Sequence, residues 1–349
     1  MKKIFLAALV AVFGFANQVF AQTQLATLFR DGDVKTFYGI SALRDAHSNA
    51  EHGDVITLSS GTFNSVDITK AITLRGAGMQ YDSIAKTEPT ILTGDFNLAI
   101  PNDSTLQGYS LTMEGIYHNN TGKVLLTYPI FNAQFVKCRF YTIGASSSSQ
   151  VIGNSLRNAS FINCIISHQL DAEEYGSITC VNSFITDPYK AVSSSSSYNS
   201  GISFEFQNCV IYLSSSTYNP DYSTYRNCII SGAYQIPSSS TAYNCIGIRG
   251  NIFSNMSNTS NEYVSASSSV FKTWGGTSSI NNFKSENLEL TDAAKTKYLG
   301  TDGTQVGIYG GSIPFTARPS NPQITKLNVA SKSTADGKLS VDIEVKAAE

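Results

Sequence analysis

A short phrase recurs through the middle of this chain, and it limits the possible folds more than any other feature of the sequence. The clearest copies are SFINCIIS at residues 160–167 and TYRNCIIS at residues 224–231. Related copies occur at residues 134–140, 179–186, 204–211 and 241–246. Each copy is a β-rich run, an Asn or Lys, a Cys or Ser, and then mostly apolar residues. Such repetition indicates units that bury their apolar faces against one another.

The spacing of the copies favours a solenoid of stacked strands over a repeat of strict length. Successive Cys-position residues are 26, 19, 26, 19 and 17 residues apart, counted at Cys138, Cys164, Ser183, Cys209, Cys228 and Cys245. Runs of Ser, Asn and Gly lie between the copies and are typical of loops. A stack of strands tolerates variable spacing because extra residues can extend outward as loops while the strands stay in register.

Stacking would place like residues in files about 4.8 Å apart from coil to coil. The repeated Asn would then form a ladder in which each side chain bonds to its neighbours and satisfies backbone groups at a bend. An exposed row for ligand binding is the alternative. This Asn file consists of Asn163, Asn182, Asn208, Asn227 and Asn244.

The cysteines beside the Asn file are predicted to be buried and reduced. Free Cys behaves as a small apolar residue. Disulfides between neighbouring coils are within reach, but stacked side chains point in parallel, which is a poor geometry for a bridge. No paired Cys/His spacing predicts a metal site, and Cys180 lies outside the file without an evident role. The file consists of Cys164, Cys209, Cys228 and Cys245.

The segment 39–79 carries a more specific pattern. Ile40, Leu43 and Ala46 recur at helical spacing, and strands are expected at residues 55–58 and 72–76. The segment resembles the N-terminal cap and first coils of pectin-lyase-like right-handed parallel β-helix proteins, in which a helix covers the open end of the coil.

A second phrase resembles the same superfamily. Residues 299–311, LGTDGTQVGIYGG, are similar to the closing phrase of many exported bacterial β-helix proteins. The resemblance implies an all-β, right-handed parallel β-helix (a solenoid) over residues 22–318, with a short N-terminal capping helix. It implies little about activity, because one scaffold carries many functions.

The two ends of the chain differ from the repeats. Residues 1–21 have a basic start, an apolar stretch at residues 4–15 and small residues before a cleavage point after Ala21, which is typical of a secretory signal peptide. A buried N-terminal strand is the alternative. We therefore expect an exported protein in the periplasm, at the cell surface or outside the cell. Residues 319–349 alternate on either side of Asp336-Gly337, which predicts a C-terminal β-hairpin or attachment segment.

Composition limits the partners. Only 14% of the residues are charged, the formal net charge is -2, and no basic patch stands out, so nucleic acid is not an expected partner. No apolar run after the signal peptide reaches about 18 residues, so no transmembrane segment is expected. No motif indicates a cofactor, and a monomer is predicted.

Acidic residues are scarce in the repeats, which argues against an enzyme. A polysaccharide lyase or glycoside hydrolase on this scaffold should show a groove where two carboxylates, or a carboxylate and an arginine, converge within about 10 Å. A catalytic group could be assembled around one loop, although an exposed charged loop explains the same residues. Its members are Asp171, Glu173, Glu174, Arg157 and His168.

Tyrosine is more suggestive, because the chain has 18 of them and many lie near polar loops. Aromatic faces among Asn and Ser suit sugar rings, although Tyr could also simply cover the loops. The preferred patch is Tyr212, Tyr218, Tyr222 and Tyr225. We therefore expect a non-catalytic protein that binds a polysaccharide or cell-surface glycan, with a carbohydrate-active enzyme and a purely structural spacer as alternatives.

Overall fold

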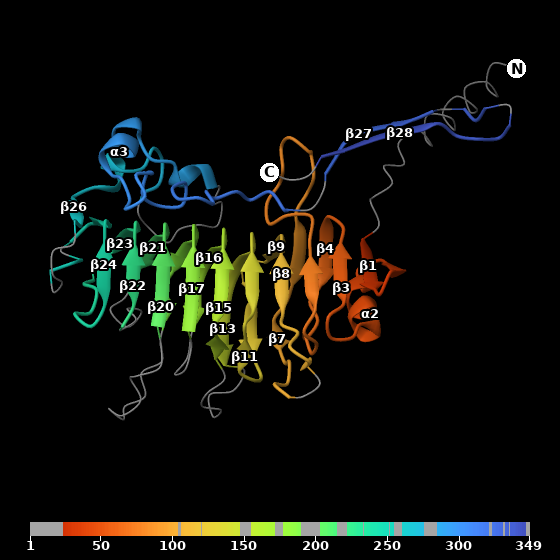
Figure 1. Cartoon of the computed structure of the whole chain (residues 1–349), viewed down its shortest axis with the longest axis horizontal. Helices are drawn as coiled ribbons and strands as arrows, with labels where there is room; N and C mark the ends of the chain where they lie inside the picture. The colour runs from red at the N-terminus through yellow and green to blue at the C-terminus, as the bar shows by residue number, and fades with distance from the viewer. Residues whose placement is uncertain are drawn as a thin grey trace, which may run out of the picture.

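The computed structural model shows an all-β chain built mainly from long parallel sheets, arranged like a solenoid (Figure 1). The expected signal peptide lies outside the residues that the structure describes. Those residues are 24–103, 106–119, 121–146, 155–171, 177–189, 203–214, 222–232, 234–250, 252–254, 260–275, 285–320, 323–330, 332–334 and 336–346.

Two long sheets, here sheet A and sheet B, run the length of the molecule, and from β3 onward their neighbouring strands are parallel. Sheet A contains, in spatial order, β2 (Asp33–Tyr38), β1 (Leu25–Arg30), β3 (Val55–Leu58), β5 (Thr73–Arg75), β8 (Thr112–Glu114), β12 (Gln134–Val136), β15 (Ala159–Ile162), β17 (Ser177–Val181), β20 (Ser203–Gln207), β22 (Thr224–Arg226) and β24 (Thr241–Tyr243). Sheet B contains β26 (Glu262–Val264), β25 (Ile246–Ile248), β23 (Ile229–Gly232), β21 (Val210–Leu213), β18 (Phe184–Thr186), β16 (Ile165–Asp171), β13 (Arg139–Ser146), β9 (Ile116–His118), β6 (Thr90–Thr93) and β4 (Gly61–Asn64), with β7 (Phe96–Leu98), β10 (Lys123–Leu126) and β19 (Pro188–Tyr189) beside them. A smaller parallel pair is β11 (Ile130–Phe131) with β14 (Leu156–Arg157).

The recurring phrase is the corner between the two sheets. Its first residues end a sheet A strand, and its last residues begin a sheet B strand. All five residues of the Asn file sit at this corner with positive φ, from 46° at Asn182 to 55° at Asn227. Asn is one of the few non-glycine residues that tolerates this left-handed conformation. The phrase therefore recurs because each coil needs the same sharp bend.

The residue after each Asn faces the interior and bonds the coils together. All six cysteines are free and buried. The Cys228 amide donates to Cys245 Sγ at 3.4 Å, and the Cys164 amide donates to Ser183 Oγ at 2.9 Å. The Cys228 thiol in turn donates to its own coil at the Arg226 carbonyl oxygen, 3.3 Å away. A small side chain that can both accept and donate is thus favoured at this corner, which explains why Ser replaces Cys at position 183.

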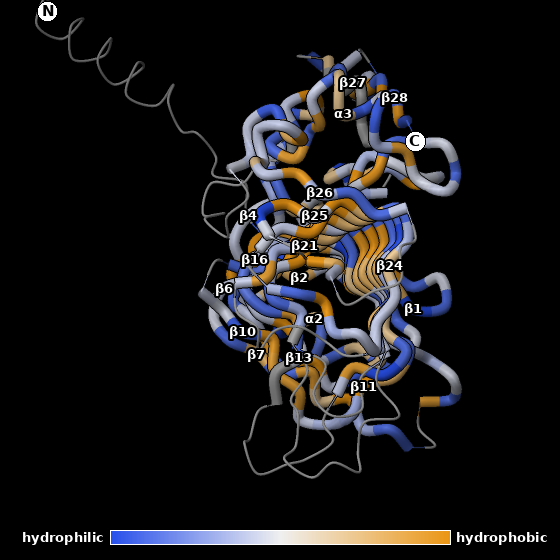
Figure 2. Tube along the Cα trace, turned by 90° about the vertical axis from the view of Figure 1, so that its left-hand side faces the viewer, coloured by the Kyte–Doolittle hydropathy of each residue, from blue (hydrophilic) through white to orange (hydrophobic). Residues whose placement is uncertain are grey.

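Sheet A contributes the large side chains of the interior. Phe161, Cys180, Phe206 and Tyr225 are register partners on successive strands, and all are buried. Phe206 and Tyr225 stack with ring centroids 5.0 Å apart. Figure 2, viewed along the stack, shows the apolar, orange stretches of successive strands superposed near the β24 label. Cys180, which had no role in the sequence analysis, is therefore an interior residue of sheet A.

A second apolar cluster lies outside sheet B. The first residue after each Cys or Ser faces outward there and is covered by the chain that follows the last coil. These covered residues are Ile165, Phe184, Val210, Ile229 and Ile246. The covering segment includes η4 (Ser267–Ser269), Trp274, η5 (Ser285–Leu288), α3 (Asp292–Lys297) and residues 299–320. Both apolar residues of the repeated phrase are thus buried, one inside the coil and one beneath this segment.

Residues 299–320, here the strap, run back along the Asn file towards the N-terminal coils (Figure 1). Asn182 Nδ2 donates to the carbonyl oxygens of Ile308 and Gly310 at 2.8 and 2.7 Å. Asn227 Oδ1 accepts from the Thr301 amide at 2.9 Å. Asn163, Asn182, Asn227 and Asn244 thus bond strap residues, whereas Asn208 packs against Gly310 and Gly311 of the strap. A left-handed backbone turns these amides outward, where the strap meets them.

The glycines of the closing phrase allow this close approach. A Cβ at Gly310 would lie 1.7 Å from the Gln305 carbonyl oxygen and 2.8 Å from Asn208 Nδ2. Further along, Asn163 Oδ1 accepts from the Thr316 amide, and Lys137 Nζ donates to Ser320 Oγ. The closing phrase is therefore an external strap and contributes no coil.

The N-terminal end is covered by α2 (Ala42–Asn49), as expected. Its residues Ala42, Leu43 and Ala46 are fully buried on the face that meets the stack. Ile40, which was expected on the same apolar face, precedes the helix and is 49% exposed. The antiparallel pair β1 and β2, which the sequence analysis did not predict, extends sheet A beyond the helix. Among the described helices, none combines the length and hydropathy needed to cross a membrane.

The C-terminal hairpin pairs β27 (Gln323–Val329) with β28 (Val341–Lys346) in antiparallel register. It leaves the strap after Ser320, whose amide donates to Glu114 Oε1 at 3.0 Å, and it projects beyond the N-terminal end of the stack (Figure 1). Val341, Ile343 and Val345 are 50 to 59% exposed. The hairpin is therefore an appendage at the opposite end from the last coil.

The strap bonds predict a difference between two otherwise similar Asn residues. Asn182→Gly should lower the free energy of unfolding by about 2 kcal/mol, because two buried carbonyl oxygens lose their donor while glycine keeps the bend. Asn158→Gly is the matched control, because Asn158 also has positive φ but is exposed and bonds Asn132 at 2.6 Å. Its cost should stay below about 1 kcal/mol. Equal costs in urea unfolding would contradict the role assigned to the strap.

Candidate functional site

The residues considered for catalysis make different contacts in the structure. Arg157 lies over the Phe131 ring, with its guanidinium carbon 5.3 Å from the centroid. His168 is exposed and stacks on Tyr141 at 4.5 Å between centroids. Asp171 is only 4% exposed and accepts a bond from Gln169 Nε2. Glu173 and Glu174 lie outside the described residues. These contacts of the described members involve different partners, and their grouping as a reaction centre stays a prediction.

Within the expected tyrosine patch, Tyr225 was a wrong choice. Its side chain is 0% exposed, because it belongs to the interior row of sheet A. Tyr212 is half-buried against the outer cluster on sheet B, whereas Tyr222 is 52% exposed beside sheet A. Tyr218 lies outside the described residues. The position of Tyr225 two residues before Asn227, matching Phe161 and Phe206, was the sequence signal for burial.

Asp187 is a buried carboxylate that the sequence analysis did not single out. Burial raises its pKa, although hydrogen bonds from the hydroxyl and amide of Ser214 oppose that shift. Asp67 and Asp95 similarly accept the amides of Asn97 and Lys123 in the next coil, both at 2.8 Å. The repetition identifies a structural device that joins successive coils.

The structure instead brings functional groups together around Tyr109, between two adjoining hollows. The first hollow has a volume of about 350 Å³ and the second about 540 Å³. Both are lined by Tyr109 and Gln107. These volumes fall in the usual range for small-ligand sites. We call the two hollows together the Tyr109 groove.

A strained turn presents the Tyr109 ring. Gln107 and Gly108 both have positive φ, 47° and 85°, and the Tyr109 amide donates to the Leu106 carbonyl oxygen at 2.7 Å. The ring lies against Gly53, where a Cβ would be 2.7 Å from two ring carbons. It remains 50% exposed. Gln107 is one of several described non-glycine residues at positive φ, and here the bend sets the direction of the Tyr109 ring.

The first hollow offers neutral hydrogen-bonding groups beside a second aromatic ring. Asn102, Gln107, Ser110 and Asn132 supply amides and a hydroxyl, and Phe131 supplies the ring. Asn132 has positive φ and accepts from Asn158, which fixes the amide at the wall. Arg157 stacks behind Phe131, so one residue from the expected catalytic group supports this wall.

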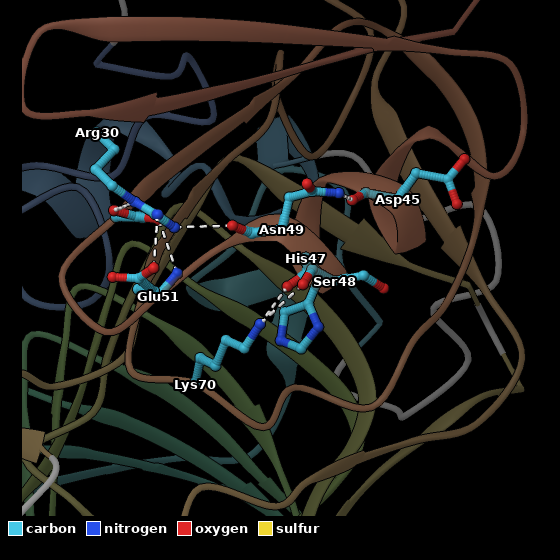
Figure 3. A network of polar contacts seen from close by, with 8 residues as sticks. Arg30, Asp45, His47, Ser48, Asn49, Glu51 and Lys70 are labelled. Carbon is cyan, nitrogen blue, oxygen red and sulfur yellow. Dashed lines mark hydrogen bonds and ion pairs between the residues drawn. The ribbon is translucent and has the colours of Figure 1, made fainter.

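The second hollow is built on an ion-paired arginine (Figure 3). Arg30 donates to Glu51 Oε1 and Asp54 Oδ2, both at 2.7 Å, and to the Asn49 carbonyl oxygen at 2.8 Å. The hydrogen bonds from Arg30 to Asp54, together with nearby carboxylates, raise the pKa of Arg30. Glu51 stays largely exposed at 73%, whereas Asp54 is buried. Two carboxylates and an arginine therefore converge here, which meets the geometric expectation stated for an enzyme.

Two histidines tie α2 to the first coil near this hollow. His47 Nε2 accepts from the Thr69 amide at 3.3 Å, and His52 Nδ1 accepts from the Ala71 amide at 3.0 Å. Desolvation, and then the charge of Lys70, lower the pKa of His47 to about 4. Lys70 Nζ donates to the His47 carbonyl oxygen (Figure 3). His47 is therefore neutral in the folded state at neutral pH.

The described residues of the groove do not form a metal site. Among the described residues, no three His, Cys, Asp or Glu side chains are placed to hold a metal ion. Burial raises the pKa of the Cys164 thiol to about 12, so it is not a nucleophile at neutral pH.

A scan against protein-family models matched none, and searches of curated proteins and of solved structures found no match.

The lowered pKa of His47 predicts acid sensitivity. Protonation is easier in the unfolded chain, so the stability contributed by neutral His47 is full above about pH 6.5 and decreases as the pH falls towards 4. The loss should be about 3 kcal/mol, because a buried ring whose pKa falls from 6.5 to about 4 must take up a proton. His47→Gln keeps an acceptor for Thr69 and should flatten this part of the profile in urea unfolding. An unchanged slope in the variant would contradict the assignment.

Proposed function

We propose that this chain is an exported, right-handed parallel β-helix of the pectin-lyase-like type that binds glycans without cleaving them. The parallel sheets, the repeated corner and the helix at the N-terminal end support the fold assignment. The N-terminal residues that are typical of a signal peptide support export.

The half-exposed Tyr109 ring between two hollows carries the proposal for glycan binding. A sugar ring offers C–H groups on its faces and hydroxyls around its rim, so it suits an aromatic face flanked by amides. Tyr109 and Phe131 supply faces, and Asn102, Gln107 and Asn132 supply amides. The adjoining hollows give space for more than one sugar unit.

The first test removes the aromatic face. Tyr109→Ala should weaken binding to a glycan found on an oligosaccharide array by at least about tenfold, because a central aromatic contact contributes about 1.4 kcal/mol or more. Tyr109→Phe should stay within about threefold, since the ring is kept. Affinities are measured by isothermal titration calorimetry.

A displaced ring gives an independent check. Gly53→Ala puts a Cβ into the space of the Tyr109 ring and should also weaken binding. Gly94→Ala is the matched control, because Gly94 has a similar positive φ of 87° with nothing within 4 Å. Binding that survives both Tyr109→Ala and Gly53→Ala would contradict the assignment of the groove.

A carbohydrate-active enzyme is the second candidate, and the second hollow favours it. Glu51 and Asp54 both bond Arg30, so their carboxylates lie on the two sides of one guanidinium. Paired carboxylates are the usual equipment of glycoside hydrolysis. The same ion pairs also have a structural explanation, because Arg30 at the end of β1 holds the two carboxylates of the turn before β3. Binding without cleavage therefore remains the leading proposal.

Product analysis separates these candidates. The leading proposal expects wild-type protein to release neither reducing ends nor unsaturated products from any glycan that it binds. An enzyme would release them, and Glu51→Gln would lower that rate by about 100-fold or more while leaving binding intact. Tyr109-dependent binding together with Glu51-dependent cleavage would replace the leading proposal with the second.

A further inference from the structure

We infer that the Tyr109 groove excludes polyanionic chains such as polyuronates and takes glycans that carry no negative charge. The inference rests on the proposed function and names the ligand class of the same site. It follows from the contacts that the cations around the groove already make and from the acidic side chains that line it.

The cations at the groove are already engaged by the protein. Arg30 uses its Nε, one Nη1 and its Nη2 hydrogens on Asp54, Glu51 and the Asn49 carbonyl oxygen. Lys70, which lies next to this network, donates to the carbonyl oxygens of His47 and Ser48. A carboxylate or sulfate on a sugar would have to compete with these contacts, which are strong because they are charge-assisted.

Arg157, one coil beyond the first hollow, is engaged as well. Its guanidinium lies over the Phe131 ring and its Nε donates to Ser155 Oγ at 3.2 Å. It is not one of the residues that line either hollow. Its contribution is to hold the aromatic wall, and a polyanion in the groove would gain little from it.

The acidic side chains, in contrast, line the groove itself. Asp103 lines the first hollow, and Asp31, Glu51 and Asp54 line the second, whereas Arg30 is the one cation among the described lining residues. Asp31 and Asp103 are exposed, and the Glu51 side chain is 73% exposed. The lining therefore carries a negative balance, so a polyanion would meet like charge, whereas the amides around Tyr109 bond hydroxyls of an uncharged sugar equally well.

The test compares three polymers on one protein. Wild-type protein, Tyr109→Ala and Asp31→Asn are titrated by calorimetry with a neutral mixed-linkage β-glucan, with polygalacturonate and with chitosan, at low and high salt. Neutral array hits replace the β-glucan if it does not bind. We expect binding of the neutral glycan that needs Tyr109, changes less than about twofold with salt and exceeds the affinity for polygalacturonate by at least about tenfold, and we expect Asp31→Asn to narrow that difference by weakening the repulsion of the polyanion.

The outcomes separate the ligand class from the function. Tyr109-dependent binding that is tighter for polygalacturonate than for neutral glycans would overturn the inference and leave the proposed function standing, whereas tight binding of the cationic chitosan would agree with the negative lining. Glycan binding of any class that Tyr109→Ala does not weaken would overturn the proposed function, and so would the absence of binding to all neutral and charged glycans. In either of these two cases the inference fails together with the proposed function.

Discussion

Register between coils is the constraint on which the rest of this structure depends. Each coil turns from sheet A to sheet B at a residue with positive φ, and the next small side chain bonds the backbone of its neighbours. If one coil slipped by a residue, the Asn would face the wrong way, and its outward and inward apolar neighbours would exchange places. The corner is therefore the most repetitive part of the sequence, whereas the loops between coils vary in length.

The two ends of the sheet A strands serve different purposes. The strap occupies the corner at which β8 ends, where Glu114 bonds Ser320. Tyr109 lies just before the same strand begins at Thr112. A fold held closed along one corner can thus leave the opposite corner open for a ligand. The Tyr109 groove gains rigid walls because Gly53, Asn132 and Asn158 all belong to the stacked framework.

The repeated phrase was enough to predict the parallel strands, the buried free cysteines and the interior file, because those features repeat with the backbone. The strap was not predictable in the same way, since its partners are distant in the sequence, for example by 74 residues for Asn227 and Thr301 and by 126 residues for Asn182 and Ile308. Tyr225 was placed in a binding patch by its neighbourhood in the sequence, although its position in the phrase matches Phe161. Tyr109 was missed because its signal consists of Gly108 and a distant Gly53, which only the folded chain brings together.

A crystal structure of this chain tests the central claim most directly, through the spacing of the residues that follow each corner Asn. The account predicts that Cys164, Ser183, Cys209, Cys228 and Cys245 lie in one interior file, with Cα atoms of successive members about 5 Å apart. A structure in which these residues are dispersed, or face solvent, would contradict the stacking and every assignment that follows from it.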